Sequence, residues 1–194
     1  SIKELGQYKK ELKQGKDKKK QYMHSIIAGG YDLYNQLGIK PTNKGMYETP
    51  IIHPPVKLPL YHSSLLSYSV YSQHSVLVTT DGSLKGVGDN RNGQISSTLE
   101  KTIFTEFIDF SINDGNGVQM IPFSAVCYQY GTLYMFYKSN SINKHLVLCD
   151  CEINGGNPVF LDIGNHQPVS LFGGWNHSAA ICREGEVIFI NRNS

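Results

Sequence analysis

A pattern of short β-like segments with a glycine at each corner recurs along this chain at intervals of about fifty residues. Its clearest copy spans residues 74–95, where Asp81-Gly82 joins "VLVTT" to "SLKGV". An Asp-Gly pair between two such segments is a strong signal for a β-hairpin, because glycine accepts the positive φ that a tight turn requires. The pattern therefore predicts two antiparallel strands with a turn at Gly82.

The same pattern returns near the C-terminus. Residues 177–178, a His-Ser pair, stand eight and seven residues before Gly185, and residues 74–75 stand at the same distances before Gly82. We place a third copy between these two, with its turn at Gly131. The three turn glycines are then 49 and 54 residues apart.

Two copies are less regular than the others. In the third, Phe123-Ser124 take the place of the His-Ser pair, and Tyr137-Lys138-Ser139 replace Gly-Asp-Asn. A fourth fragment near the N-terminus aligns three residues with the clearest copy: Gly30 with Gly88, Gln36 with Gln94, and Leu37 with Ile95.

A period near fifty made of short strands is typical of propeller blades rather than of helical solenoids. The low content of charged residues (18%) and the 19 glycines and 12 tyrosines fit a β-rich chain. We expect an all-β protein: a partial β-propeller of about three to four blades, each a four-stranded antiparallel sheet, after a short basic lead-in over residues 1–22 that is helical or disordered. The predicted units are about 23–63, 64–112, 113–166 and 167–194.

The repeated residues resemble the repeat of the regulator of chromosome condensation family, the RCC-type β-propellers. The resemblance covers about residues 23–194 and implies four-stranded blades, seven to a closed ring. This chain holds about three and a half repeats, so the ring is expected to be incomplete: the chain is a fragment of a propeller, or its ring is completed by another copy or another protein. The motif is carried by His74, Ser75, Val78, Gly82, Leu84, Gly88, Asn90, Gly93, Gln94 and Ile95, again by Gly173, Gly174, His177, Ser178, Gly185, Val187 and Asn193, and by Gly30, Asp32, Gln36, Leu37 and Gly38.

The glycine-rich stretch does not fit a phosphate-binding or calcium loop. Four residues separate Gly88 from Gly93, which breaks the dinucleotide spacing, and an EF-hand loop beginning at Gly88 would end at Leu99 instead of a carboxylate. The chain has no G-x-S-x-G, H-E-x-x-H or P-loop sequence. We therefore predict no catalytic, cofactor-binding or metal-binding residues and no enzyme activity.

Histidine and cysteine could each have carried chemistry in this chain. We interpret His74 and His177 as structural, each joining the start of a strand to a neighbouring backbone by a hydrogen bond. Cys149 and Cys151 are too close in sequence for a usual zinc pair, and reduced thiols are expected for the four cysteines.

Charge is concentrated at the N-terminus. Residues 1–20 hold eight lysines against three acidic residues, a net charge of +5, so the remaining residues carry 2 − 5 = −3. A basic tail can contact nucleic acid or an acidic partner, although a solvated lead-in without a ligand is the simpler interpretation. No apolar run reaches the roughly 20 residues of a membrane helix, and an intracellular protein, cytoplasmic or nuclear, is expected.

The resemblance implies a non-catalytic scaffold that binds a protein partner through loop faces, for example in a cytoskeletal or ubiquitin-pathway assembly. The alternatives are nucleotide exchange on a Ran-like small GTPase and association with chromatin through the basic tail. Exchange is disfavoured because the family's exchange factor has an acidic residue before its His-[ST] pair, where this chain has Ser72-Gln73 and Trp175-Asn176.

The candidate partner contacts are mostly aromatic or charged. Trp175 either binds a partner or caps the gap between two blades, and we favour the second interpretation. The tyrosines of the third unit either bind a partner or fill the space between blades, and again we favour the second. The candidates are Trp175, Tyr128, Tyr130, Asp89, Arg91, Lys18, Lys19 and Lys20.

Overall fold

The computed structural model describes residues 26–39, 52–58, 65–113, 118, 120–138, 143–150, 152–153, 155 and 157–191. Within these ranges the chain forms strands and turns and no α-helix. The prediction of an all-β protein is confirmed. The expected basic lead-in over residues 1–22, with Lys18, Lys19 and Lys20, lies outside the described residues, as does Asn193.

The strands form four antiparallel sheets, which we name A to D in chain order. Only sheets B and C have the expected four strands among the described residues. Sheet A contains β1 (Ile27–Tyr31) and β2 (Ile52–Lys57); sheet B contains β3 (Leu65–Val70), β4 (His74–Thr79), β5 (Leu84–Asp89) and β6 (Ile103–Phe110); sheet C contains β7 (Met120–Tyr128), β8 (Gly131–Lys138), β9 (Lys144–Asp150) and β10 (Val159–Leu161); sheet D contains β11 (Pro168–Gly173), β12 (His177–Cys182) and β13 (Val187–Asn191).

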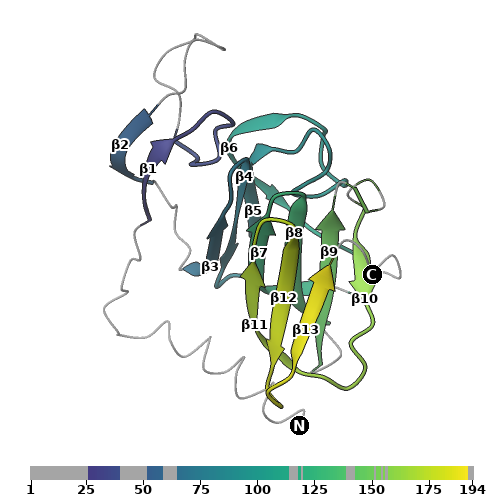
Figure 1. Cartoon of the computed structure of the whole chain (residues 1–194). Coiled ribbons are helices and arrows are strands. Elements are labelled where there is room, and N and C mark those ends of the chain that lie inside the picture. The colour runs from purple at the N-terminus through teal and green to yellow at the C-terminus, as the bar shows by residue number, and fades with distance from the viewer. Residues whose placement is uncertain are drawn as a thin grey trace.

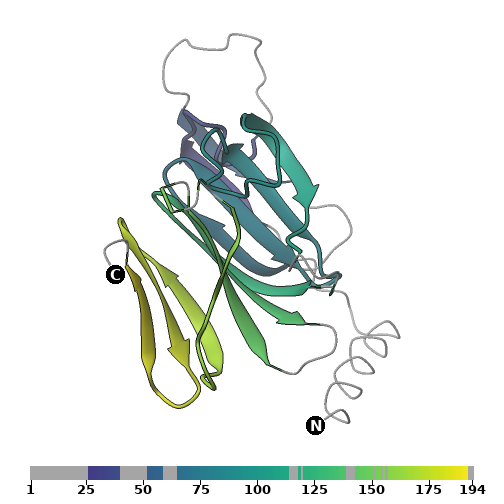
Figure 2. The same ribbon diagram turned by 90° about the vertical axis from the view of Figure 1, so that its right-hand side faces the viewer.

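Successive sheets stack face to face, as Figures 1 and 2 show. The first strands of sheets B, C and D, namely β3, β7 and β11, lie next to one another. Two side chains of β3 bridge to β7: Ser69 Oγ accepts a hydrogen bond from Cys127 N (2.8 Å), and Ser67 Oγ donates to Ala125 O (3.4 Å). First strands gathered in this way are the inner strands of propeller blades. The prediction of a partial β-propeller is therefore confirmed.

Apolar side chains fill the space between each pair of neighbouring sheets. Between sheets B and C, Val76 and Val78 of β4 pack in one cluster with Tyr134 and Phe136 of β8, and all four are buried. Burying both faces of an inner sheet explains why β4 and β8 read as nearly continuous apolar runs. The other two layers contain Ile26, Ala28, Leu37, Ile39, Leu58 and Leu77 (sheets A and B) and Tyr128, Leu133, Met135, Leu146, Leu148 and Ala180 (sheets C and D).

The turns at two predicted glycines have the expected geometry. Gly82 lies between β4 and β5 with φ of +86°, and Gly185 lies between β12 and β13 with φ of +93°. A Cβ at either glycine would meet no other atom within 4 Å, so the backbone conformation alone favours glycine there.

The predicted alignment of the third copy is wrong by one strand. Gly131 is the first residue of β8 rather than a turn, and Thr132 pairs with Cys127 as Ser75 pairs with Val70. Gly131-Thr132 therefore occupy the place of the His-Ser pair, and residues 123–124 lie one strand earlier, in β7. Glycine is needed at position 131 for a different reason, since a Cβ there would overlap the backbone of β9.

Candidate functional site

His74 joins sheet B to sheet C. Its side chain is fully buried, and Nε2 lies 3.1 Å from Gly131 O and 2.9 Å from Thr132 Oγ1. Because the Thr132 hydroxyl donates its own hydrogen to Gln94 O (3.0 Å), Nε2 of His74 must carry the proton and donate to both oxygens. His74 Nδ1 has no hydrogen-bond partner among the described residues.

Burial keeps the His74 ring neutral. It lowers the pKa of His74 to about 4, against weaker opposing effects from the Gly131 hydrogen bond and the charge of Asp89. A neutral ring without access to water cannot exchange protons with a substrate at neutral pH. The geometry supports the interpretation of His74 as a structural residue.

A second hydrogen bond recurs at the junctions between sheets. Ser75 Oγ donates to Gln36 O across sheets A and B, and Thr132 Oγ1 donates to Gln94 O across sheets B and C. Each glutamine in turn closes its own loop, because its Oε1 accepts from the backbone N two residues earlier: Tyr34 N for Gln36 (2.9 Å) and Asn92 N for Gln94 (3.0 Å). The repeated Gln and Ser/Thr positions thus bind sheet B to sheet A and sheet C to sheet B, whereas the matching hydroxyl of sheet D, on Ser178, has no such bond among the described residues.

The His-Ser pair of sheet D is in a different environment. Ser178 is buried, whereas His177 is exposed. The backbone amide of Gly174 donates to His177 O (2.9 Å), and a Cβ at Gly174 would collide with the imidazole. His74 reaches across to a following sheet, but among the described residues no sheet follows sheet D.

The turns that precede β4, β8 and β12 lie at one end of the sheets, and we call residues 71–73, 129–130 and 174–176 the turn face. Trp175 is 66% exposed there, so among the described sheets it does not cap a gap between blades. Its carbonyl oxygen accepts a hydrogen bond from Gln129 N (3.3 Å), which places the last two turns side by side. Tyr130, on the neighbouring turn, is partly exposed.

Two predicted partner contacts are inaccessible. Tyr128 is only 3% exposed, and its hydroxyl donates to the Asp150 carboxylate. Asp89 is also buried and forms an ion pair with Arg91 (2.8 Å between Oδ2 and Nη2). Asp89 was a candidate partner contact because of its charge, but it serves an internal contact. For Tyr128, burial fits the favoured interpretation that the tyrosines of this unit fill space, and not the alternative that they bind a partner. Arg91 itself is half exposed and lies over the ring of Tyr34 (5.8 Å).

One face of sheet D is apolar and exposed. In sheet B, Gly86 of β5 pairs with Val76, and that face is buried against sheet C. The matching position in sheet D is Phe189, which pairs with Ala179 and is 71% exposed. We call this surface the outer face of sheet D, and it comprises Phe172, His177, Val187 and Phe189.

Buried thiols offer no nucleophile at neutral pH in sheet C. Burial raises the pKa of Cys127 and of Cys149 to about 12, and both side chains are free cysteines. Cys151, the other half of the closely spaced pair, lies outside the described residues.

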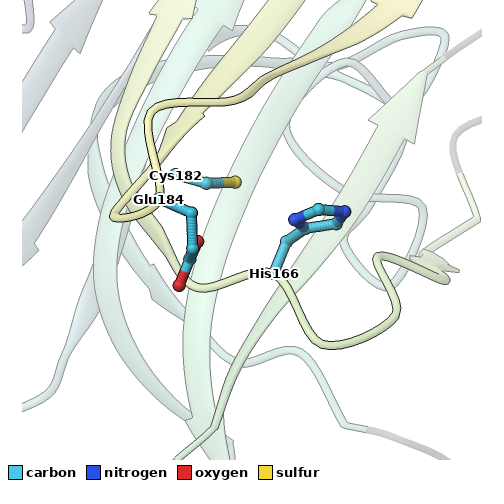
Figure 3. Close-up of side chains that lie close together, drawn as sticks. All are labelled: His166, Cys182 and Glu184. Atoms are coloured by element: carbon cyan, nitrogen blue, oxygen red, sulfur yellow. The ribbon is translucent and has the colours of Figure 1, made fainter.

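A cluster of possible metal ligands was missed at the sequence level. His166 lies in the loop before β11, and Cys182 and Glu184 lie at the turn between β12 and β13. One ligand atom from each lies within 4.8 Å of the others, and Figure 3 shows the Cys182 sulfur directed toward the His166 ring. No short sequence motif indicates this cluster, because His166 and Cys182 are brought together only by the pairing of β11 with β12.

The described part of the chain contains no helix that is long and apolar enough to cross a membrane.

The sheets and their junctions define a class of protein, the partial β-propeller with blades joined through buried His, Ser/Thr and Gln positions. The model of the regulator of chromosome condensation (RCC1) repeat matches residues 69–94, so the chain carries an RCC1 repeat, as its sequence indicated. A search of curated proteins finds no match.

Solved structures share this fold. The chain is similar to human WBSCR16 (TM-score 0.66, 18% identity, covering 87% of this chain and 43% of that one). It is also similar to Prp20p from Saccharomyces cerevisiae (TM-score 0.58, 15% identity, 90% and 43%) and to yeast RCC1 (Prp20) bound by Kap60 (TM-score 0.56, 15% identity, 88% and 38%). The chain therefore spans less than half the length of these RCC1-type propellers.

Proposed function

We propose that this chain is a non-catalytic protein-interaction module that binds a protein partner through its turn face. The observation that carries the proposal is Trp175, a large aromatic side chain that is two-thirds exposed on a turn held in place by a backbone hydrogen bond to the neighbouring turn. Exposed tryptophans on rigid loops are enriched among the residues that dominate binding energy at interfaces. Tyr130 adds a second aromatic side chain on the adjacent turn.

Structural relatives support a protein partner. The Prp20p structure was described together with its binding to Gsp1p and histones, and the second yeast structure contains Kap60. Because this chain is only 15% identical in sequence to both yeast structures, the shared fold does not show that it binds the same partners. It supports the general use of such a propeller as a binding surface.

Trp175→Ala should reduce partner capture at least tenfold, because removing a central aromatic contact costs about 2 kcal/mol or more. The measurement is quantitative mass spectrometry of proteins retained by immobilised wild type, Trp175→Ala and Phe160→Ala. Phe160 is a partly exposed aromatic residue on β10, away from the turn face, and serves as the matched control. Proteins that bind wild type and Phe160→Ala but not Trp175→Ala are the expected outcome, and equal retention by all three would contradict the proposal.

Nucleotide exchange on a small GTPase is the alternative use of the same face. The turns before β4 and β12 carry Ser72-Gln73 and Trp175-Asn176. Neither pair offers a carboxylate, the feature that the family's exchange factor has before its His-[ST] pair. Release of labelled GDP from a panel of small GTPases separates the two functions. Acceleration well above the intrinsic rate would favour exchange over the scaffold.

We also propose that a second copy packs on the outer face of sheet D. Each copy exposes apolar side chains at both ends of its array: Phe189 on sheet D, and Ile27 and Ile52 on sheet A. Inside the chain, each such face is buried by the next sheet. Head-to-tail contact between copies would bury both ends at once.

Phe189→Asp should weaken this association at least tenfold, because a charge would be buried in an apolar contact. Sedimentation velocity over a hundredfold range of concentration measures it, with Phe160→Asp as the control. Wild type that stays a monomer throughout, or Phe189→Asp that associates like wild type, would contradict the proposed contact.

A further inference from the structure

The cluster at the turn between β12 and β13 is held together by the backbone. Arg183 N donates to Gln167 O (2.8 Å), and Gln167 N donates to Glu184 Oε2 (3.3 Å). These bonds fix the loop that carries His166 against the turn that carries Glu184 (Figure 3). The turn itself is closed by Cys182 N donating to Glu186 O (2.8 Å). These bonds therefore fix the backbone segments that carry the three ligand residues.

The donor set is mixed and partly accessible. Cys182 supplies a buried sulfur, and His166 and Glu184 supply nitrogen and oxygen at the surface. A second carboxylate is at hand, since Glu186 Oε2 lies 3.4 Å from His166 Nδ1. Ligand atoms in a tetrahedral zinc site are about 3.5 Å apart, so modest rotation of the exposed His166 and Glu184 side chains would close the observed spacing of up to 4.8 Å.

Charge favours a cation at this position. The Glu184 carboxylate lies beside the Cys182 sulfur and the His166 ring, and the Glu186 carboxylate lies beside the same ring. Two carboxylates gathered around the other donors attract a divalent cation.

Arg183 is next to Glu184 in sequence and contributes its backbone N to the loop. Its side chain makes no ion pair with Glu184 or Glu186 in the part of the chain that the structure describes.

We propose that His166, Cys182 and Glu184 bind a zinc-class divalent cation, with Glu186 available as the fourth protein ligand. Zinc accepts a set that combines sulfur, imidazole nitrogen and carboxylate oxygen, whereas magnesium and calcium prefer sites made of oxygen ligands alone. Binding displaces the thiol proton to solvent, so Cys182 becomes a thiolate ligand without any change in oxidation state. The cation would clamp the loop before β11 to the turn after β12. The inference is independent of the proposed partner binding.

Cobalt(II) titration of the reduced chain tests the proposal, because a thiolate-to-cobalt band in the near ultraviolet reports a cysteine ligand. We expect a band that saturates at one cobalt per chain, disappears when zinc is added, and is lost in Cys182→Ser. His166→Gln and Glu184→Gln should weaken cobalt binding at least tenfold. Glu106→Gln, an exposed carboxylate on β6, should bind as wild type.

A second readout covers the case in which Cys182→Ser does not fold. Zinc should slow alkylation of Cys182 in wild type at least tenfold, measured peptide by peptide by mass spectrometry, and should not protect it in His166→Gln. Absence of the cobalt band in wild type, a band that persists in folded Cys182→Ser, or alkylation of Cys182 that zinc does not slow would each overturn the assignment.

Discussion

Gly88→Ala is expected to lower the free energy of unfolding by about 3 kcal/mol or more, because two costs coincide at this residue. Gly88 has φ of +96°, a backbone conformation that alanine adopts only with strain. A Cβ there would also lie 2.8 Å from His74 Cα and closer still to Gln73 O, so the backbone of the adjacent strand would have to move. Gln36 Cα of sheet A lies 3.2 Å from the same Cβ position, so the added methyl group would also be crowded from sheet A.

Gly82→Ala is the matched control, since it shares the positive φ (+86°) but has open space around its Cβ position. It should cost about 1 kcal/mol, the conformational part alone. Urea denaturation followed by circular dichroism gives both values. Equal losses for the two variants would show that the close approach of β4 to β5 at Gly88 contributes nothing.

Lowering the pH from 7.5 to 4.5 is expected to reduce stability through His74 by roughly 2 to 3 kcal/mol. The folded pKa of His74 is about 4 and the ordinary pKa of histidine is 6.5, so between these values the unfolded chain binds a proton that the folded chain does not. The stabilisation is therefore complete above pH 6.5 and is lost as the pH falls towards 4. Protonation would place a charge on a buried ring whose Nδ1 has no partner among the described residues.

His74→Gln isolates this contribution. Glutamine can still donate to Gly131 O but does not titrate, so the variant should be less stable than wild type at pH 7.5 and should lose less stability on acidification. Urea unfolding at both pH values measures the double difference. His177→Gln, an exposed histidine at the same position of sheet D, should keep the pH dependence of wild type. A His74→Gln variant with the full wild-type pH dependence would contradict the assignment.

The residues at the turns allowed the fold class to be predicted from the sequence. Asp81-Gly82 and Gly185 mark hairpins whose geometry depends on a few neighbouring residues. The same reasoning failed at Gly131, where glycine serves close contact with β9 instead of a turn. A glycine in a sequence does not state which of these two reasons applies, so the third copy was aligned one strand out of register.

Accessibility was the other quantity that residue type did not predict. Trp175 was expected to cap a gap and is exposed, whereas Asp89 was a candidate partner contact and is buried. Tyr128, which could bind a partner or fill space, is also buried. The difference lies in contacts between distant residues: Tyr128 meets Asp150 on another strand of sheet C, and the position of Trp175 depends on where the turn of sheet C lies.

The amino-acid sequence by itself determined the all-β class, the repeat near fifty residues and the hairpin turns, because these depend on backbone preferences of adjacent residues. Only the tertiary structure decided that His74 reaches Gly131, that Trp175 is exposed, and that His166 meets Cys182 and Glu184. The contact of His74 depends on the stacking of sheet B on sheet C, and the meeting of His166 with Cys182 depends on the pairing of β11 with β12. Neither depends on a local preference of adjacent residues.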